Sequence, residues 1–269
     1  MTEYSPPLDK LLTLGDCREL RTWPNYLEFG LTAAHIPDLI RLVADSELHQ
    51  ASSEDPAVWG PIHAWRALGQ LRAEAAIEPL MSLFHELEED DWVHEELPEV
   101  YSMIGPAAIP ALKAYLSDPS HNLFPRVTAS SSLARIATEH PEARDECISV
   151  LTQELEKLKE HDPEFNGFLI ASLCDLQAVE SAETIQRAFA VNSVDPSIAG
   201  DWEDVQVALG LKEARETPRE YGFFPTSGSD SFVDSTTQQL NAAKKARNKT
   251  KAKNKMARQS RKKNRKKRK

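Results

Sequence analysis

Two short apolar helical patterns that follow each other almost without a gap constrain the fold of this chain more than any other feature. From His63 to Leu80 the sequence reads HAWRALGQLRAEAAIEPL, and residues 72–74 alone separate the two patterns. Apolar residues recur at three- and four-residue spacing in both patterns, which predicts two amphipathic helices joined by a tight turn. Four small residues flank this turn, namely Gly69, Ala73, Ala75 and Ala76. We therefore expect the two helices to approach each other closely there.

A weaker copy of the stretch returns further along the chain. A shift of 105 residues, about three times 35, superimposes three pairs of apolar residues, namely Leu68 and Leu173, Leu71 and Leu176, and Leu80 and Ile185. A single amphipathic pair cannot bury its apolar faces alone, so neighbouring pairs are expected to stack into a solenoid with a shared core. The alternative, a compact helical bundle, would not need a repeating period.

The same spacing predicts helices throughout the body of the chain, and no stretch alternates as a half-buried strand would. Pairs such as Gly60-Pro61 and Gly105-Pro106 mark where helices end. The predicted helices lie near residues 34–44, 62–71, 75–88, 93–104, 107–116, 126–138, 142–160, 167–176 and 181–190, and a last one begins after Asp201. We expect an all-α helical-repeat solenoid over residues 1–211, a linker over 212–240 and a disordered basic tail over 241–269.

Charge divides the chain into two parts of opposite sign. Residues 241–269 contain 16 Lys and Arg and no Asp or Glu, so the preceding 240 residues hold the other 16 basic residues and all 42 acidic residues, a net charge of −26. The basic segment has too few apolar residues to fold alone. Its charge predicts salt-dependent binding to the phosphates of RNA or the ribosome. Folding back onto the acidic body, or binding an anionic membrane surface, are the alternatives.

The end of the basic segment is the strongest candidate site in the sequence. The run ARQSRKKNRKKRK has no aromatic residue that could stack on a base, so contacts to phosphate are expected. The candidate nucleic-acid-binding residues are Arg258, Arg261, Lys262, Lys263, Arg265, Lys266, Lys267, Arg268 and Lys269.

Sequence features predict a cytoplasmic protein without a cofactor. The start, MTEYSPPLDKLLTLGD, lacks the basic and apolar regions of a signal peptide, and no apolar run approaches the roughly 18 residues that cross a bilayer. The three cysteines, Cys17, Cys147 and Cys174, form no C-x-x-C pair, so neither a zinc site nor a redox motif is predicted. Nucleophile-elbow, phosphate-loop and dinucleotide motifs are absent from the sequence, and we assign no catalytic residue.

Several phrases of the chain resemble known helical repeats. AAIPALKAYLSDPSHNLFPRVTASSSLARIA, residues 107–137, resembles the HEAT-like repeat of phycobilisome lyases. WPNYLEFGL, PIHAWRALGQL, ELPEVYSMIGPAAIPAL, HPEARDECISVL and GDWEDVQVALGL resemble a bacterial family of HEAT-like proteins of unknown function, over residues 8–211. The resemblance implies an armadillo-type fold and almost no biochemistry. Many such proteins end in a SEC-C zinc module, which this chain is expected to lack because no Cys follows Cys174.

In HEAT-like arrays the second helix of each pair lines the concave face. The polar residues on these helices that could meet a partner are Arg66, Gln70, Glu96, Glu99 and Arg135. Because carboxylates are in excess in the body, the field around it favours a basic protein partner. We therefore expect a non-enzymatic adaptor or scaffold that binds a protein through its concave face and RNA, the ribosome or another polyanion through its tail. The oligomeric state stays open.

An enzyme is the alternative, either a relative of the bilin lyases or a metal-dependent hydroxylase. His94-Glu95 resembles one of the His-Glu pairs with which HEAT-like deoxyhypusine hydroxylases hold two irons. The equivalent positions in the other repeats lack a His-Glu pair, because His63, Thr128 and Gly167 are not followed by Glu. One pair cannot hold two irons, so no metal site is predicted.

Overall fold

The computed structural model describes residues 4–52 and 54–218 of the chain. All regular elements in these residues are helices, and none of these residues belongs to a strand, which confirms the all-α prediction. Among them, no helix combines the length and the apolar composition needed to cross a membrane. The predicted basic tail lies outside the described residues, and so do its nine candidate nucleic-acid-binding residues.

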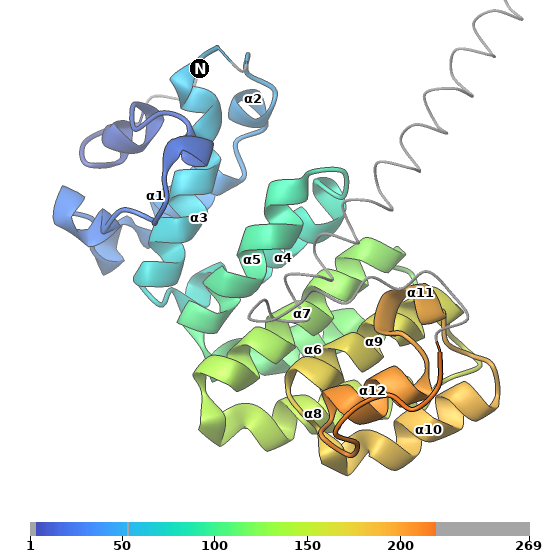
Figure 1. Cartoon of the computed structure of the whole chain (residues 1–269). Helices are drawn as coiled ribbons and strands as arrows, with labels where there is room; N and C mark the ends of the chain where they lie inside the picture. Colours follow the sequence, from blue (N-terminus) through green and yellow to red (C-terminus); the bar gives the residue numbers. More distant parts are fainter. Residues whose placement is uncertain (1–3, 53, 219–269) are drawn as a thin grey trace, which may run out of the picture.

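The longer helices form two rows that run in chain order (Figure 1). The first row consists of α1 (Ile36–Val43), α4 (Ile77–Glu86), α6 (Ile109–Ser117), α8 (Arg144–Leu155) and α10 (Ala182–Ala190). The second row consists of α3 (Gly60–Gln70), α5 (Asp91–Ile104), α7 (Leu123–Glu139) and α9 (Pro163–Asp175). Each helix packs against its neighbours in its own row, and α1, α4, α6 and α8 pack against the second-row helix that follows them. This stacking of helical pairs is the predicted helical-repeat fold.

Three short helices complete the array. α2 (Ser46–His49) lies in the connection between α1 and α3. α11 (Pro196–Ala199) packs against α9, and α12 (Trp202–Ala208) packs against α9 and α10. α12 begins at the predicted N-cap, because the Asp201 side chain accepts a hydrogen bond from the backbone of Asp204 at 2.9 Å. α2 and α11 were not predicted from the sequence.

Equivalent turns confirm the predicted shift of 105 residues. Arg72 and Gln177, which this shift superimposes, both adopt left-handed backbone angles, with φ of 51° and 48°. The amide of Ala73 donates to the carbonyl of Leu68 at 3.1 Å, and the amide of Ala178 donates to the carbonyl of Leu173 at 3.0 Å. Both turns therefore end a second-row helix in the same way. A short 3-10 turn then leads into the next first-row helix, at residues 74–76 and 179–181.

The core fills the space between the two rows. Trp65, Tyr101 and Phe168 are buried. A β-carbon on Gly69 would lie 3.1 Å from the sulfur of Met103 on α5, so the expected close approach of helices occurs at this glycine. Ala73 and Ala76 are buried too, whereas Ala75 is exposed. The three cysteines are free and buried.

The chain covers both ends of the array. Residues 8–29 form three short 3-10 helices that cover α3 on the side away from α5 (Figure 1). At the other end, residues 212–217, placed by the sequence in the linker, return to α12. The Glu203 side chain accepts hydrogen bonds from the amides of Glu216 and Thr217, at 2.9 and 3.2 Å. Arg215 binds Asp201 through two hydrogen bonds of 2.6 and 3.0 Å.

Candidate functional site

A buried ion pair joins α3 to α5. Arg66 Nε donates to Glu96 Oε2 at 2.8 Å, and Arg66 Nη2 makes a second, parallel bond to Glu96 Oε1. The indole of Trp65 donates to the same carboxylate at 2.9 Å. Arg66 is 2% exposed and Glu96 is 9% exposed. Neither side chain reaches the surface, so the pair acts between helices by holding α3 and α5 in register.

The N-terminal segment closes over this pair. The Arg66 guanidinium lies 5.0 Å from the ring of Trp23 and 5.9 Å from the ring of Trp92, within range of cation–π attraction. His63 Nε2 donates to the carbonyl of Gly15 at 3.0 Å, so its Nδ1 accepts from the hydroxyl of Tyr26 at 2.7 Å. Burial lowers the pKa of His63 to about 4, which keeps this imidazole neutral at neutral pH.

Cys17 lies beside His63 but is not an activated nucleophile. Its Sγ is 3.5 Å from His63 Nε2, and the side chain is 2% exposed. Burial raises the pKa of the Cys17 thiol to about 12. The thiolate is the nucleophilic form of cysteine, and a raised pKa disfavours it. This contact therefore contributes packing rather than nucleophilic chemistry.

The other three predicted concave-face residues, Gln70, Glu99 and Arg135, lie on α3, α5 and α7. The Gln70 side chain holds the N-terminal segment, because it accepts from the amide of Tyr26 and donates to the carbonyl of Pro24, both at 2.8 Å. Glu99 on α5 forms an ion pair of 3.2 Å with Arg135 on α7. Both of these side chains are 35% exposed, so they reach the solvent. The five predicted residues thus connect α3, α5 and α7, and their role in binding a partner stays a prediction.

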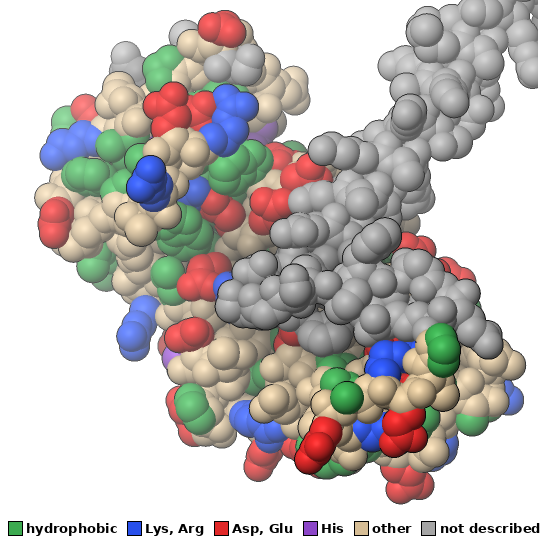
Figure 2. Space-filling view, in the orientation of Figure 1, with side chains coloured by type: hydrophobic (Ala, Val, Ile, Leu, Met, Phe, Trp, Pro, Cys, Tyr) green, Lys and Arg blue, Asp and Glu red, His purple; other side chains and the backbone are tan. Residues whose placement is uncertain are grey.

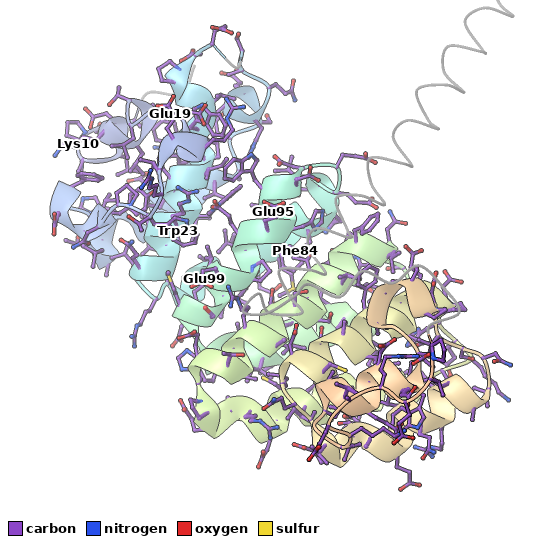
Figure 3. All side chains as sticks on the ribbon, viewed as in Figure 1. Lys10, Glu19, Trp23, Phe84, Glu95 and Glu99 are labelled. Atoms are coloured by element: carbon purple, nitrogen blue, oxygen red, sulfur yellow. The ribbon has the colours of Figure 1, made fainter. Side chains whose placement is uncertain are left out.

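One face of α5 carries carboxylates at four-residue spacing. Asp91, Glu95 and Glu99, here called the α5 acidic strip, lie one turn apart on the same side of the helix. Asp91 and Glu95 are exposed. Figure 2 shows acidic side chains gathered over the N-terminal half of α5, and Figure 3 shows Glu95 and Glu99 spaced along the helix. A strip of this kind attracts cationic side chains.

The strip ends at a pocket of about 440 Å³. Its walls come from the C-terminal ends of three second-row helices and from the N-terminal segment. They consist of Asn25, Leu27, Gly69, Gln70, Arg72, Glu99, Ser102, Met103, Glu139 and His140. The helix C-termini add partial negative charge to the carboxylates of Glu99 and Glu139. Leu27 is 42% exposed and offers an apolar contact at the rim. Arg72 and His140 belong to the same walls, so the pocket carries basic as well as acidic groups.

His94, the residue of the metal hypothesis, is buried and has partners on both ring nitrogens. Its Nε2 donates to the carbonyl of Glu88 at 2.9 Å, and its Nδ1 forms a hydrogen bond with the hydroxyl of Thr128. Within residues 4–52 and 54–218 no three His, Cys, Asp or Glu side chains are grouped as metal ligands would be. His94 therefore ties α5 to α7 and to the preceding turn.

Sequence reasoning missed two parts of this site. Asp91 and Glu95 belong to the acidic stretch HELEEDDWVHEELPE but were not selected from it, although their four-residue spacing from Glu99 signals a common helix face. The pocket could not be found, because its walls join residues from Asn25 to His140.

Comparison with known proteins gives a family for most of the chain. The sequence profile of the family described as "Protein of unknown function (DUF1186)" matches residues 31–219. Neither a curated protein nor a solved structure matches the chain.

Proposed function

This chain belongs to the DUF1186 family of proteins of unknown function, and from its geometry we propose that it is a non-enzymatic adaptor. The body binds a basic segment of a protein partner along the α5 acidic strip and its pocket. The basic segment, residues 241–269, binds RNA, the ribosome or another polyanion. The repeats are of the HEAT-like, phycobilisome-lyase type. The protein works in the cytoplasm.

The observation that carries the proposal is the continuity of the strip with the pocket. Asp91, Glu95 and Glu99 span two turns of α5, a distance of about 12 Å at 1.5 Å per residue. Glu99 belongs both to the strip and to the pocket wall. An extended peptide with basic residues can therefore lie along α5 and insert one of them into the pocket. The net charge of −26 over residues 1–240 steers such a partner toward the body.

A labelled peptide of Lys, Arg and Ala, used as a generic basic segment, tests the body. We expect it to bind the full chain with an affinity that falls about tenfold when Glu95 and Glu99 are both replaced by Gln, because two of the three strip carboxylates are lost. The Asp145→Asn/Glu146→Gln variant, which removes two exposed carboxylates from the start of α8, is the matched control and should bind as the original chain does. Fluorescence anisotropy measures both affinities. Equal losses in the two variants would refute the assignment of the strip.

The salt dependence of RNA binding tests the basic segment. Replacing all nine candidate residues from Arg258 to Lys269 by Gln is expected to weaken binding to a single-stranded RNA. The slope of log K against log salt concentration should decrease by about 0.7 for each phosphate contact that is lost. The measurement is a titration by anisotropy at several salt concentrations. An unchanged slope would show that these side chains make no phosphate contacts.

A further inference from the structure

We propose that the α5 acidic strip of the free protein is occupied by the chain's own basic segment, residues 241–269, and that a polyanion removes this segment. The inference rests on the proposed function, because it names the first occupant of the same surface. It makes the two binding activities of the adaptor depend on each other.

Two of the three strip carboxylates, Asp91 and Glu95, lie on an exposed side of α5, and the third, Glu99, forms an ion pair with Arg135 of α7. On its other sides, Tyr101 donates a hydrogen bond to the carbonyl of Ile77 at the start of α4, Glu96 binds Arg66 of α3, and His94 binds Thr128 of α7. The remaining side carries the strip, next to the mixed-charge pocket. A ligand for this side has to supply cations along an extended or helical stretch.

The last described residues of the chain are anchored to the body. Arg215 is anchored to α12 by its hydrogen bonds to Asp201 and by an ion pair of 2.8 Å to Asp204. Lys212 adds a 3.1 Å ion pair with Glu203. Residue 218 is the last described residue, and residues 219–243 separate it from Lys244. These 25 residues can span at most about 80 Å at roughly 3.3 Å per residue.

Charge and tethering then favour the segment over a partner in solution. The segment carries 16 positive charges and no negative ones, while the rest of the chain has a net charge of −26. A covalent linker of this length holds its end at an effective concentration in the millimolar range. A free basic peptide at micromolar concentration would compete poorly, even with equal contacts. The nearest basic ligand of the strip is therefore part of the same molecule.

Occupancy of the strip by the chain's own basic segment, here called self-occupancy, couples the two binding surfaces of the adaptor. RNA that binds the segment frees the strip, and a basic partner that binds the strip frees the segment. By linkage, each ligand raises the affinity for the other by the same factor. The full chain is thus poised to take its protein partner when a polyanion is present.

Zero-length cross-linking of the chain at low concentration tests the proposal. A carbodiimide joins lysines to carboxylates that are in direct contact, and mass spectrometry identifies the joined residues. We expect lysines of 244–269 to be joined to Asp91, Glu95 and Glu99, and these products to be lost when heparin is added. Products spread evenly over the body, with Asp145 and Glu146 of α8 as prominent as the strip, would overturn the proposal. So would the absence of products within one chain.

A matched pair of charge reversals gives a second test in the full chain. Asp91→Lys/Glu95→Lys changes the strip, and Asp145→Lys/Glu146→Lys makes the same change of charge at the exposed start of α8. Both variants gain general attraction for RNA, but the first also releases the segment. We expect the strip variant to bind a short RNA about tenfold more tightly than the α8 variant. Equal affinities would overturn self-occupancy.

The outcomes separate this inference from the proposed function. If the labelled basic peptide binds the strip but no cross-link forms to the segment, self-occupancy is wrong and the adaptor proposal stands. If the peptide ignores Glu95 and Glu99 and no cross-link forms, the strip is not a binding surface and both proposals are wrong.

Discussion

The Glu96→Gln variant is expected to lose about 3–5 kcal/mol of its free energy of unfolding, because it leaves Arg66 buried without its carboxylate. Arg66 is 2% exposed and cannot turn to water without displacing Trp23 and Trp92. The amide that replaces the carboxylate cannot neutralise the guanidinium. Urea denaturation followed by circular dichroism measures the loss.

Glu99, three residues further along α5, is the control. Its ion pair with Arg135 is half-exposed, and such pairs contribute up to about 1 kcal/mol. Glu99→Gln should therefore change the free energy of unfolding by 1 kcal/mol at most. Replacing both buried partners, as Arg66→Met/Glu96→Leu, should recover much of the loss, because no charge is then left buried. Equal losses for Glu96→Gln and Glu99→Gln would contradict this account.

Acid is expected to destabilise the protein through Glu154 of α8. This carboxylate is buried, with His161 Nε2 at 3.0 Å, Lys157 Nζ at 2.7 Å, the Ser117 hydroxyl at 2.8 Å and Arg126 Nη2 at 2.9 Å. Burial alone would raise the pKa of Glu154, but the hydrogen bonds it accepts outweigh burial and lower this pKa to about 2. The folded-state pKa is below the unfolded value of 4.5. The stabilisation is therefore present above pH 4.5 and is lost as the pH falls toward 2, by roughly 3 kcal/mol in total.

A difference between two pH profiles isolates this carboxylate from others that titrate in acid. The free energy of unfolding of the original chain minus that of Glu154→Gln should shrink between pH 5 and pH 2. Glu156→Gln, at a carboxylate that is 54% exposed, should give a nearly constant difference. Parallel profiles for the original chain and Glu154→Gln would show that the buried contacts do not hold the pKa down.

The number and order of the longer helices could be predicted from the sequence, because they follow from the local spacing of apolar residues. The residues at which some helices begin could not. α9 was predicted from Gly167 and begins at Pro163. Asn166 and Gly167 resemble a break, yet the Asn166 amide donates to the carbonyls of Leu158 and Ser193, at 3.2 and 2.8 Å. A β-carbon on Gly167 would lie 3.1 Å from Ile198 of α11. Asn166 and Gly167 make contacts with other elements of the fold. Helix propensities read from a single sequence carry no information about such contacts.

Two other predicted boundaries were wrong. α7 begins at Leu123 rather than at 126, because Pro125 lies within the first turn, where its missing amide hydrogen costs nothing. α8 ends at Leu155 rather than at 160, and Glu156 and Lys157 continue as a turn. The carboxylate of Glu154, at the end of α8, is bonded to Lys157 and thus helps to shape this turn.

The helices that form the candidate site could be predicted from the sequence, but the burial of its side chains could not. Arg66 and Glu96 looked like surface positions because they are charged residues on helices. Their burial depends on Trp23, from a segment whose sequence shows no helical period, and on the pairing of α3 with α5. Charge on a helix predicts exposure unless a distant segment covers it.

The covering of α3 by residues 8–29 limits how an array of this kind can change in length during evolution. A terminal unit needs a closed outer side, whereas an inner unit contacts copies of similar shape on both sides. A duplicated helical pair can therefore be inserted between α4 and α10 with few changes to the residues that pack against it. A pair inserted ahead of α3 would have to displace the hydrogen bond between Tyr26 and His63 and rebuild the cover around Cys17.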